Sequence, residues 1–129
     1  MNWEQTTPDN LEEILQFLLP REYLCTALTA KFYKNGTAAW PEDKPLVALL
    51  RNGKKIEAVL YISKRGLTLP VFSEVAEQHV AAHSPPFFLK KLLRKMHTCI
   101  GTRSVVELLE KSKTNRKHMV LYDLMVQAG

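Results

Sequence analysis

Cysteine is scarce in this chain of 129 residues, which has only Cys25 and Cys99. Two separated cysteines make neither a dense disulfide framework nor a Cys-x-x-Cys metal site. The sequence also has no HExxH pattern, and its four histidines are scattered. These absences exclude a disulfide-stabilised scaffold and the common zinc signatures, and no metal ligand is assigned.

Long apolar runs are missing as well. No run approaches the roughly 20 residues that a membrane-spanning helix requires. The N-terminal segment contains Glu4 and Asp9 where a signal peptide has a basic region followed by an apolar one. We therefore expect a cytoplasmic protein with no membrane partner.

Acidic residues are scarce in the last third of the chain. Residues 84–129 hold nine Lys and Arg against three Asp and Glu, whereas residues 1–45 hold four against seven. Much of this basic excess falls on one predicted helix, at Lys90, Lys91, Arg94 and Lys95. These residues are a candidate surface for an anion or a partner. A solvated helix face and a nucleic-acid site are the alternatives. The phenylalanines of this helix are expected on its core side, which counts against nucleic acid.

The stretch 46–72 predicts three consecutive strands. They are Leu46–Arg51, Ile56–Ile62 and Leu67–Phe72, with turns at Asn52-Gly53 and at 64–66. Asn-Gly favours the positive φ angles of a tight hairpin turn. The middle strand is expected to place Ile56 with Ala58, Leu60 and Ile62 on one face, and Val59 with Tyr61 on the other. Both faces are apolar, which is typical of a sheet that is covered on each side.

Helices and short strands surround this meander. Apolar residues at helical spacing predict two helices between Pro8 and Asn35, and later helices that open at Ser84-Pro85-Pro86 and at the capping-box pattern Ser104-x-x-Glu107. Short strands are expected at Thr98–Ile100 and at 119–126, and 73–83 is open between a loop and a weak helix. The order ααβββαβαβ predicts a single α/β domain over residues 1–129, with a three-layer mixed sheet, an antiparallel β-meander and flanking helices.

Two stretches in this order resemble the GNAT acetyltransferase fold. They are GTRSVVELLEKSK (101–113) and the strand that ends in YDLM (122–125), and they are similar to the N-terminal halves of two-part bacterial GNAT-like proteins. FLLPREYLCTALTAKF and LLRNGKKIEAVLYIS fit the same type. The resemblance implies the N-terminal domain of an acyl-CoA-dependent N-acetyltransferase. Its cofactor would be acetyl-CoA and its partner a C-terminal GNAT catalytic half, and a stand-alone degenerate copy is the other possibility.

The cofactor loop of that family is absent from the matching interval. GNAT enzymes hold the pyrophosphate of acetyl-CoA with a Q/R-x-x-G-x-G/A loop after the fourth strand, where glycines turn backbone N–H groups toward the phosphates. Here 73–87 has no glycine, and Pro85 and Pro86 lack N–H donors. The resemblance leaves Leu69, Val71 and Phe72, at the end of the fourth strand, as residues that would pair with the pantetheine arm. We expect a non-catalytic chain that does not bind acetyl-CoA tightly.

No catalytic residue is assigned. Tyr122 matches the place of a general-acid tyrosine in GNAT enzymes, but we interpret it as a packing residue. Cys99 precedes a helix start that can lower a thiol pKa, although a buried structural cysteine is the favoured interpretation. His79 and His83 would share a face if 73–83 is helical, but a pair without a third ligand does not predict a metal site.

Two hypotheses follow from the sequence. The first is the non-catalytic GNAT-like domain of an acyltransferase. The second is a non-enzymatic interaction module whose basic helix docks an acidic partner or nucleic acid. Binding of acyl-CoA would favour the first, and binding that weakens steeply with salt would favour the second.

Overall fold

The computed structural model describes the backbone of residues 1–39, 46–63, 65–112 and 120–123. In these residues six strands form one sheet in sequence order. The strands are β1 (Asn2–Gln5), β2 (Leu46–Asn52), β3 (Lys55–Ile62), β4 (Leu67–Phe72), β5 (Thr98–Gly101) and β6 (Val120–Asp123). β1 to β4 pair antiparallel, whereas β5 pairs parallel with β4 and β6 pairs parallel with β5. The sheet is mixed, and the predicted α/β class is confirmed.

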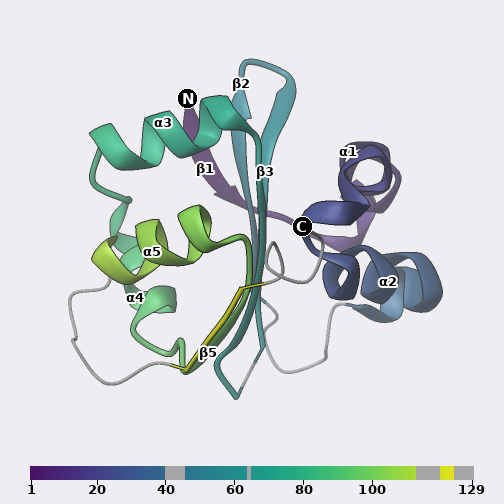
Figure 1. Ribbon diagram of the computed structural model, residues 1–129. Coiled ribbons are helices and arrows are strands. Elements are labelled where there is room, and N and C mark those ends of the chain that lie inside the picture. Colours follow the sequence, from purple (N-terminus) through teal and green to yellow (C-terminus); the bar gives the residue numbers. More distant parts are fainter. Residues whose placement is uncertain (40–45, 64, 113–119, 124–129) are drawn as a thin grey trace.

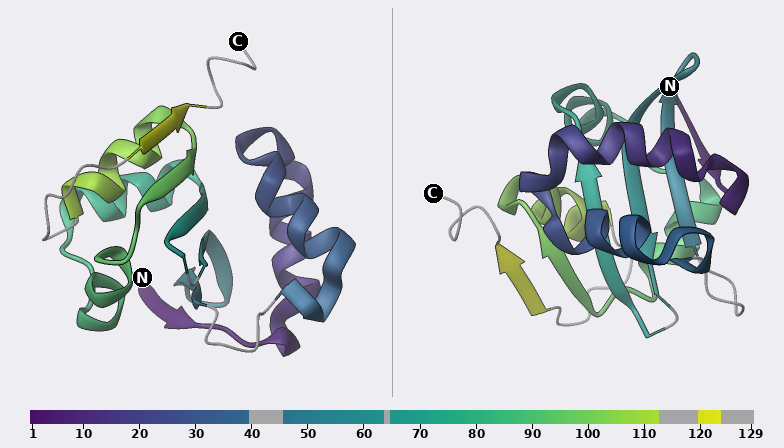
Figure 2. Two further views of the ribbon diagram at one scale, coloured as in Figure 1. Left: turned by 90° about the horizontal axis from the view of Figure 1, so that it is seen from below. Right: turned by 90° about the vertical axis from the view of Figure 1, so that its right-hand side faces the viewer.

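Helices cover both faces of this sheet (Figure 1; Figure 2). The α-helices are α1 (Leu11–Leu18), α2 (Thr26–Asn35), α3 (Glu74–Ala82), α4 (Phe87–Leu93) and α5 (Arg103–Ser112), with 3-10 segments η1 (Pro8–Asn10), η2 (Leu19–Leu24) and η3 (Gly36–Ala39). α1 and α2 lie on one face, and α3, α4 and α5 lie on the other. Among the described residues, no helix is long and apolar enough to cross a membrane.

Both helix layers cover β3, the middle strand of the meander. Ala58, Leu60 and Ile62 are buried beneath α3, α4 and α5, whereas Val59 and Tyr61 are buried beneath α1 and α2. The predicted antiparallel meander, with a middle strand buried on both faces, is confirmed. Its two buried faces make it the apolar centre of the molecule.

The predicted face of Ile56 is wrong, because β3 contains a β-bulge. Leu50 pairs with Ala58, but Arg51 pairs with Ile56, so Glu57 is an extra residue in the ladder. One extra residue reverses the alternation of side chains from that point. Ile56 therefore packs beneath α1 and α2 with Val59, and not on the face of Ala58.

The hairpin turn lies one residue later than predicted. Asn52 pairs with Lys55, so Gly53 and Lys54 form the two-residue loop. Gly53 has a φ angle of +65°, which glycine adopts without strain. The predicted positive φ angle at Gly53 is therefore confirmed, although Asn52 belongs to β2 and not to the turn.

Two elements are absent from the predicted order, which the structure extends to βααβββααβαβ. β1 is short and polar, so it has no alternation to reveal it, and it pairs along the edge of β2. The interval 73–83, left open by the sequence, contains α3, whose N-cap Ser73 accepts a hydrogen bond from Ala76 N through Oγ (3.1 Å).

Two predicted helix starts are shifted. Pro86 is the N-cap of α4, so the proline pair precedes that helix and does not form its first turn. Thr102, and not Ser104, caps α5: its Oγ1 accepts from Val105 N at 3.4 Å, and its carbonyl oxygen accepts from Val106 N at 3.0 Å. Cap signals alone do not fix a helix boundary to one residue.

Arg51 of β2 joins the sheet to the layer formed by α1 and α2. It donates to Glu4 of β1 and makes a two-pronged contact with Glu13 of α1, at 2.8 Å and 2.5 Å. The hydrogen bond from Arg51 lowers the pKa of the Glu13 carboxyl. The contact therefore stabilises the fold only while Glu13 is ionised.

This contact predicts a pH-dependent stability. The folded pKa of Glu13 lies below its unfolded value of roughly 4.3, so the stabilisation is complete above that pH and disappears as pH falls through the folded value. We expect Glu13→Gln to lower the free energy of unfolding by at most about 1 kcal/mol at neutral pH, because the pair is partly exposed. The variant and the wild type should converge in acid. Urea denaturation at several pH values measures this, with Glu12→Gln as the control. Equal effects of the two variants at neutral pH would contradict it.

Candidate functional site

The parallel pairing between β4 and β5 is short. They pair only where Leu67 meets Thr98 and Thr68 meets Cys99. β5 continues to Gly101 and β4 to Phe72, but no pairing between these later residues is present. The hydrogen-bonded ladder between the two parallel strands therefore ends at Thr68 and Cys99.

Pro70 lies just after the last paired residue of β4. Leu67 is directed toward β3, because its carbonyl oxygen accepts from Ser63 N (2.8 Å). Backbone groups alternate in direction along a strand, so Pro70 is directed toward β5, where its missing N–H removes a donor. A Cβ added to Gly101 would lie 3.0 Å from Pro70 Cγ, so the proline ring packs against this glycine. The ring fills the place where β4–β5 hydrogen bonds would continue.

A polar pocket of about 600 Å³ lies at the end of these strands. Residues of η2, the start of β3, the end of β4, the first turn of α3 and the start of α5 line it. Its charged residues are Arg21, Lys55, Glu57, Glu74 and Glu77. Open α/β sheets commonly bind ligands beyond the carboxyl ends of parallel strands, and both β4 and β5 end here. This polar pocket is the candidate functional site.

Glu57 is the buried charge of the polar pocket. Its side chain is 5% exposed, and its ion pair within the described residues is with Lys55, whose Nζ lies 3.9 Å from Glu57 Oε1. The backbone carbonyl of Glu57 accepts from Ser73 N (2.9 Å), which joins the β-bulge to the start of α3. Burying a carboxylate with one distant partner costs folding free energy. The β-bulge thus places the ion-paired Glu57 carboxylate at the pocket.

The Arg21 side chain lies against Phe17 of α1. Its guanidinium donates to the Phe17 carbonyl oxygen (2.9 Å) and lies 4.2 Å from the centre of the Phe17 ring. Arg21 keeps its positive charge at the pocket. Within the described residues, the ion pair of the pocket acids is that of Glu57 with Lys55.

The polar pocket does not fit the pyrophosphate of acetyl-CoA. The N–H of Ser73 donates to the Glu57 carbonyl oxygen, and the N–H of Ala76 donates to Ser73 Oγ, so these two backbone donors are not open to a phosphate. Glu74 and Glu77 add two carboxylates in the first turn of α3. These carboxylates would repel the negative charge of a pyrophosphate. In addition, glycine is absent from 73–87. The expected prolines lie elsewhere: Pro85 and Pro86 follow α3 and do not occupy its N-terminus.

The residues that the resemblance implies for the pantetheine arm all lie on β4, but their side chains are buried. Leu69 and Val71 pack beneath α1 and α2. Phe72 packs on the opposite face, 5.9 Å from the Trp3 ring centre to centre, and also lines the polar pocket. Of the β4 residues directed toward β5, Thr68 already pairs with Cys99, and Pro70 has no N–H and packs against Gly101.

The four candidate basic residues are spread over a helix and the turn after it. Lys90 and Lys91 belong to α4, whereas Arg94 and Lys95 follow its last residue. Lys91, Arg94 and Lys95 are exposed and Lys90 is half-buried. The expected burial of the helix phenylalanines is wrong for Phe87, which is 69% exposed and lies under Lys91 Nζ at 5.2 Å. The absence of an aromatic from this surface therefore no longer counts against nucleic acid.

The remaining candidate residues are the two cysteines and Tyr122. Burial raises the pKa of the Cys99 thiol to about 12, so the possible lowering of this pKa is wrong and the structural interpretation is confirmed. Burial also raises the pKa of Cys25. Tyr122 lies on β6, and its backbone pairs with Ile100 of β5. The side chain of Tyr122 is outside the described part of the chain.

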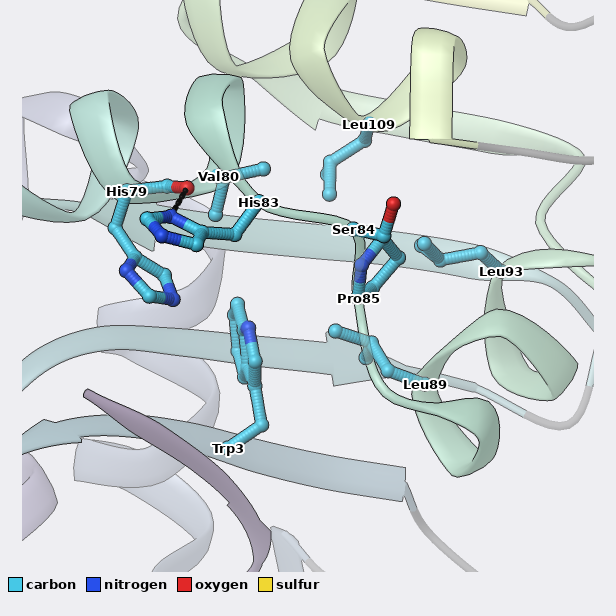
Figure 3. Close-up of a pocket in the computed structure, with 9 residues that line it drawn as sticks. All are labelled: Trp3, His79, Val80, His83, Ser84, Pro85, Leu89, Leu93 and Leu109. Atoms are coloured by element: carbon cyan, nitrogen blue, oxygen red, sulfur yellow. Dashed lines mark hydrogen bonds between the residues drawn. The ribbon is translucent and has the colours of Figure 1, made fainter.

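His79 and His83 share one face of α3, as the helical alternative predicts. Their rings stack with centres 4.4 Å apart, and His83 Nδ1 donates to the His79 carbonyl oxygen at 3.1 Å (Figure 3). They line a second hollow, with Trp3 and Leu89, whose volume of about 10 Å³ has room for one water at most. In the described part of the chain, no group of three His, Cys, Asp or Glu side chains is placed to hold a metal ion.

Sequence reasoning missed Glu57 and the polar pocket. The signal in the sequence was a glutamate, Glu57, inside the apolar run IEAVLYI. A charged residue in a strand with two apolar faces is uncommon, because charged side chains are rarely buried. No protein-family model, curated protein or solved structure matches this chain. The site is therefore judged on its own geometry.

Proposed function

We propose that this chain is a GNAT-like N-terminal domain of an acyl-CoA-dependent N-acetyltransferase, and that it does not itself catalyse acyl transfer. The observation that carries the proposal is the interrupted pairing between β4 and β5. The two parallel strands pair at Leu67 and Thr68, the pairing stops before Pro70, and both strands end beside a polar pocket. An extended ligand that adds to a strand edge needs backbone groups that the sheet does not already pair.

The order of elements also supports the proposal. A helix pair follows the first strand and covers one face, an antiparallel meander forms the middle of the sheet, and a parallel strand follows the helices of the other face. The non-catalytic character rests on the polar pocket, where Glu57, Glu74 and Glu77 replace a phosphate cradle. Acetyl-CoA would then be held by the partner half.

Calorimetric titration tests this with two ligands. S-acetylpantetheine carries the thioester and the pantetheine arm of acetyl-CoA but lacks the nucleotide. We expect both ligands to bind only in the millimolar range and with equal affinity, because the nucleotide finds no cradle. Neither should reach the low micromolar range, which corresponds to about −8 kcal/mol.

The double variant Glu74→Gln/Glu77→Gln is the matched control. Removing two carboxylates from the first turn of α3 should strengthen binding of acetyl-CoA and leave S-acetylpantetheine unchanged. Low micromolar acetyl-CoA binding by the wild type would contradict the non-catalytic assignment. Failure of both ligands to bind at millimolar concentration would contradict the GNAT-like assignment itself.

A further inference from the structure

Two segments that lie side by side in the fold contain basic residues and no acidic ones. Residues 58–73 and residues 78–106 have no Asp or Glu. They meet where the turn between β3 and β4 contacts the turn after α4. There His97 N donates to the Gly66 carbonyl oxygen (2.9 Å), and a Cβ on Gly66 would collide with the Lys95 carbonyl oxygen. The two turns therefore lie together at one end of the sheet (Figure 1).

The exposed residues at this place form what we call the basic surface. Its members are Phe87 and Lys91 of α4, Arg94 and Lys95 after that helix, and Arg65 of the turn between β3 and β4. Within the described residues, no ion pair involves Lys91, Lys95 or Arg65. The helix packed beside α4 is α5, and its exposed acids Glu107 and Glu110 are not paired with these cations either. The basic surface thus keeps a positive charge that a bound anion can neutralise.

Phe87 is the observation that indicates which anion fits. Its side chain is 69% exposed, whereas Leu89, Leu92 and Leu93 of the same helix are buried. Lys91 Nζ lies 5.2 Å from the centre of the Phe87 ring and leaves most of the ring open. A single exposed ring is ordinary on a protein surface. A ring among cations, however, combines the two features that hold single-stranded nucleic acid, which are base stacking and phosphate neutralisation.

We propose that the basic surface binds single-stranded nucleic acid. A base stacks on Phe87, and the cations of the surface contact the adjacent phosphates. Duplex DNA fits less well, because its bases are stacked on one another and their faces are closed to the ring. An anionic membrane also fits less well, since its affinity grows with buried apolar area and α4 offers one exposed apolar side chain. This inference goes beyond the acyltransferase proposal and requires no acyl group.

Fluorescence anisotropy tests the proposal with a labelled oligothymidylate of about 12 nucleotides, over a series of salt concentrations. We expect micromolar binding at low salt, tighter than binding to a duplex of the same length or to phosphatidylserine vesicles. Phe87→Ala should weaken binding about fivefold or more and leave its salt dependence unchanged, because the ring meets a base and not a phosphate.

The double variant Lys91→Gln/Lys95→Gln should change the salt dependence instead. Each lost phosphate contact lowers the slope of log K against log salt concentration by about 0.7, so the slope should fall by about 1.4. The two variants therefore separate stacking from charge neutralisation, and the double variant keeps the test decisive if Phe87→Ala is not folded. Thermal unfolding shows whether each variant is folded.

Tyr33→Ala and Lys34→Gln are the matched controls. The Tyr33 side chain is 67% exposed and Lys34 is exposed as well, but both belong to α2 on the opposite face of the sheet. Each control removes the same kind of group as its counterpart, and the affinity for oligothymidylate should equal that of the wild type. Equal affinities of Phe87→Ala and the wild type would overturn the proposal, as would an unchanged slope in the double variant. Tighter binding to the duplex or to the vesicles would overturn it too.

Discussion

Replacing Gly66 with valine is expected to lower the free energy of unfolding by roughly 3 kcal/mol or more. Gly66 has a φ angle of +89°, and a Cβ at this position would lie 2.2 Å from the Lys95 carbonyl oxygen and 2.7 Å from His97 Cδ2. The Gly66 carbonyl oxygen also accepts from His97 N (2.9 Å), which joins the β3–β4 turn to the start of β5. The side chain therefore meets backbone that cannot withdraw without breaking this junction.

Gly53→Val is the matched control for that substitution. Gly53 has a φ angle of +65°, but a Cβ there would have no atom within 4 Å. Strain in the turn alone should cost roughly 1 kcal/mol or more, so this variant isolates the conformational part. Urea denaturation of both variants gives the two values. Equal losses would show that the close approach of Lys95 and His97 is relieved at little cost.

The three central strands were the part of the fold that the sequence revealed best. Their ends at Ile62, Leu67 and Phe72 agree with prediction, because apolar runs bounded by turn residues are a local signal. β1 has no such signal, since its residues alternate in no pattern and are fixed by pairing with β2. The β-bulge at Glu57 has none either, because the register of a strand is a property of the pair.

The polar pocket was beyond prediction for a different reason. Its residues come from η2, β3, the end of β4, α3 and the start of α5, which are separated in the sequence and meet only in the folded chain. Pro70 was visible as a lost donor in the sequence, but its effect depends on the edge to which it is directed. Only the register shows that this edge faces β5.

Leu60 is a core residue of β3, the strand between the two helix layers. Leu60 is fully buried on the face that α3, α4 and α5 cover, and it lies opposite Pro70 of β4 and Ala48 of β2. Neighbours on both sides are held in the ladder, so they cannot move far into a space left by a smaller side chain. A cavity at this position should therefore persist.

Leu60→Ala is expected to lower the free energy of unfolding by about 2–5 kcal/mol, because the lost burial and the remaining cavity add together. Leu19→Ala makes the same chemical change at a side chain that is 45% exposed, and should cost about 1 kcal/mol or less. Urea denaturation measures both values, and a slope equal to that of the wild type shows that the compactness of the two states is unchanged. If Leu60→Ala loses no more than Leu19→Ala, Leu60 does not lie in a closely packed core and β3 is not the centre of the sheet.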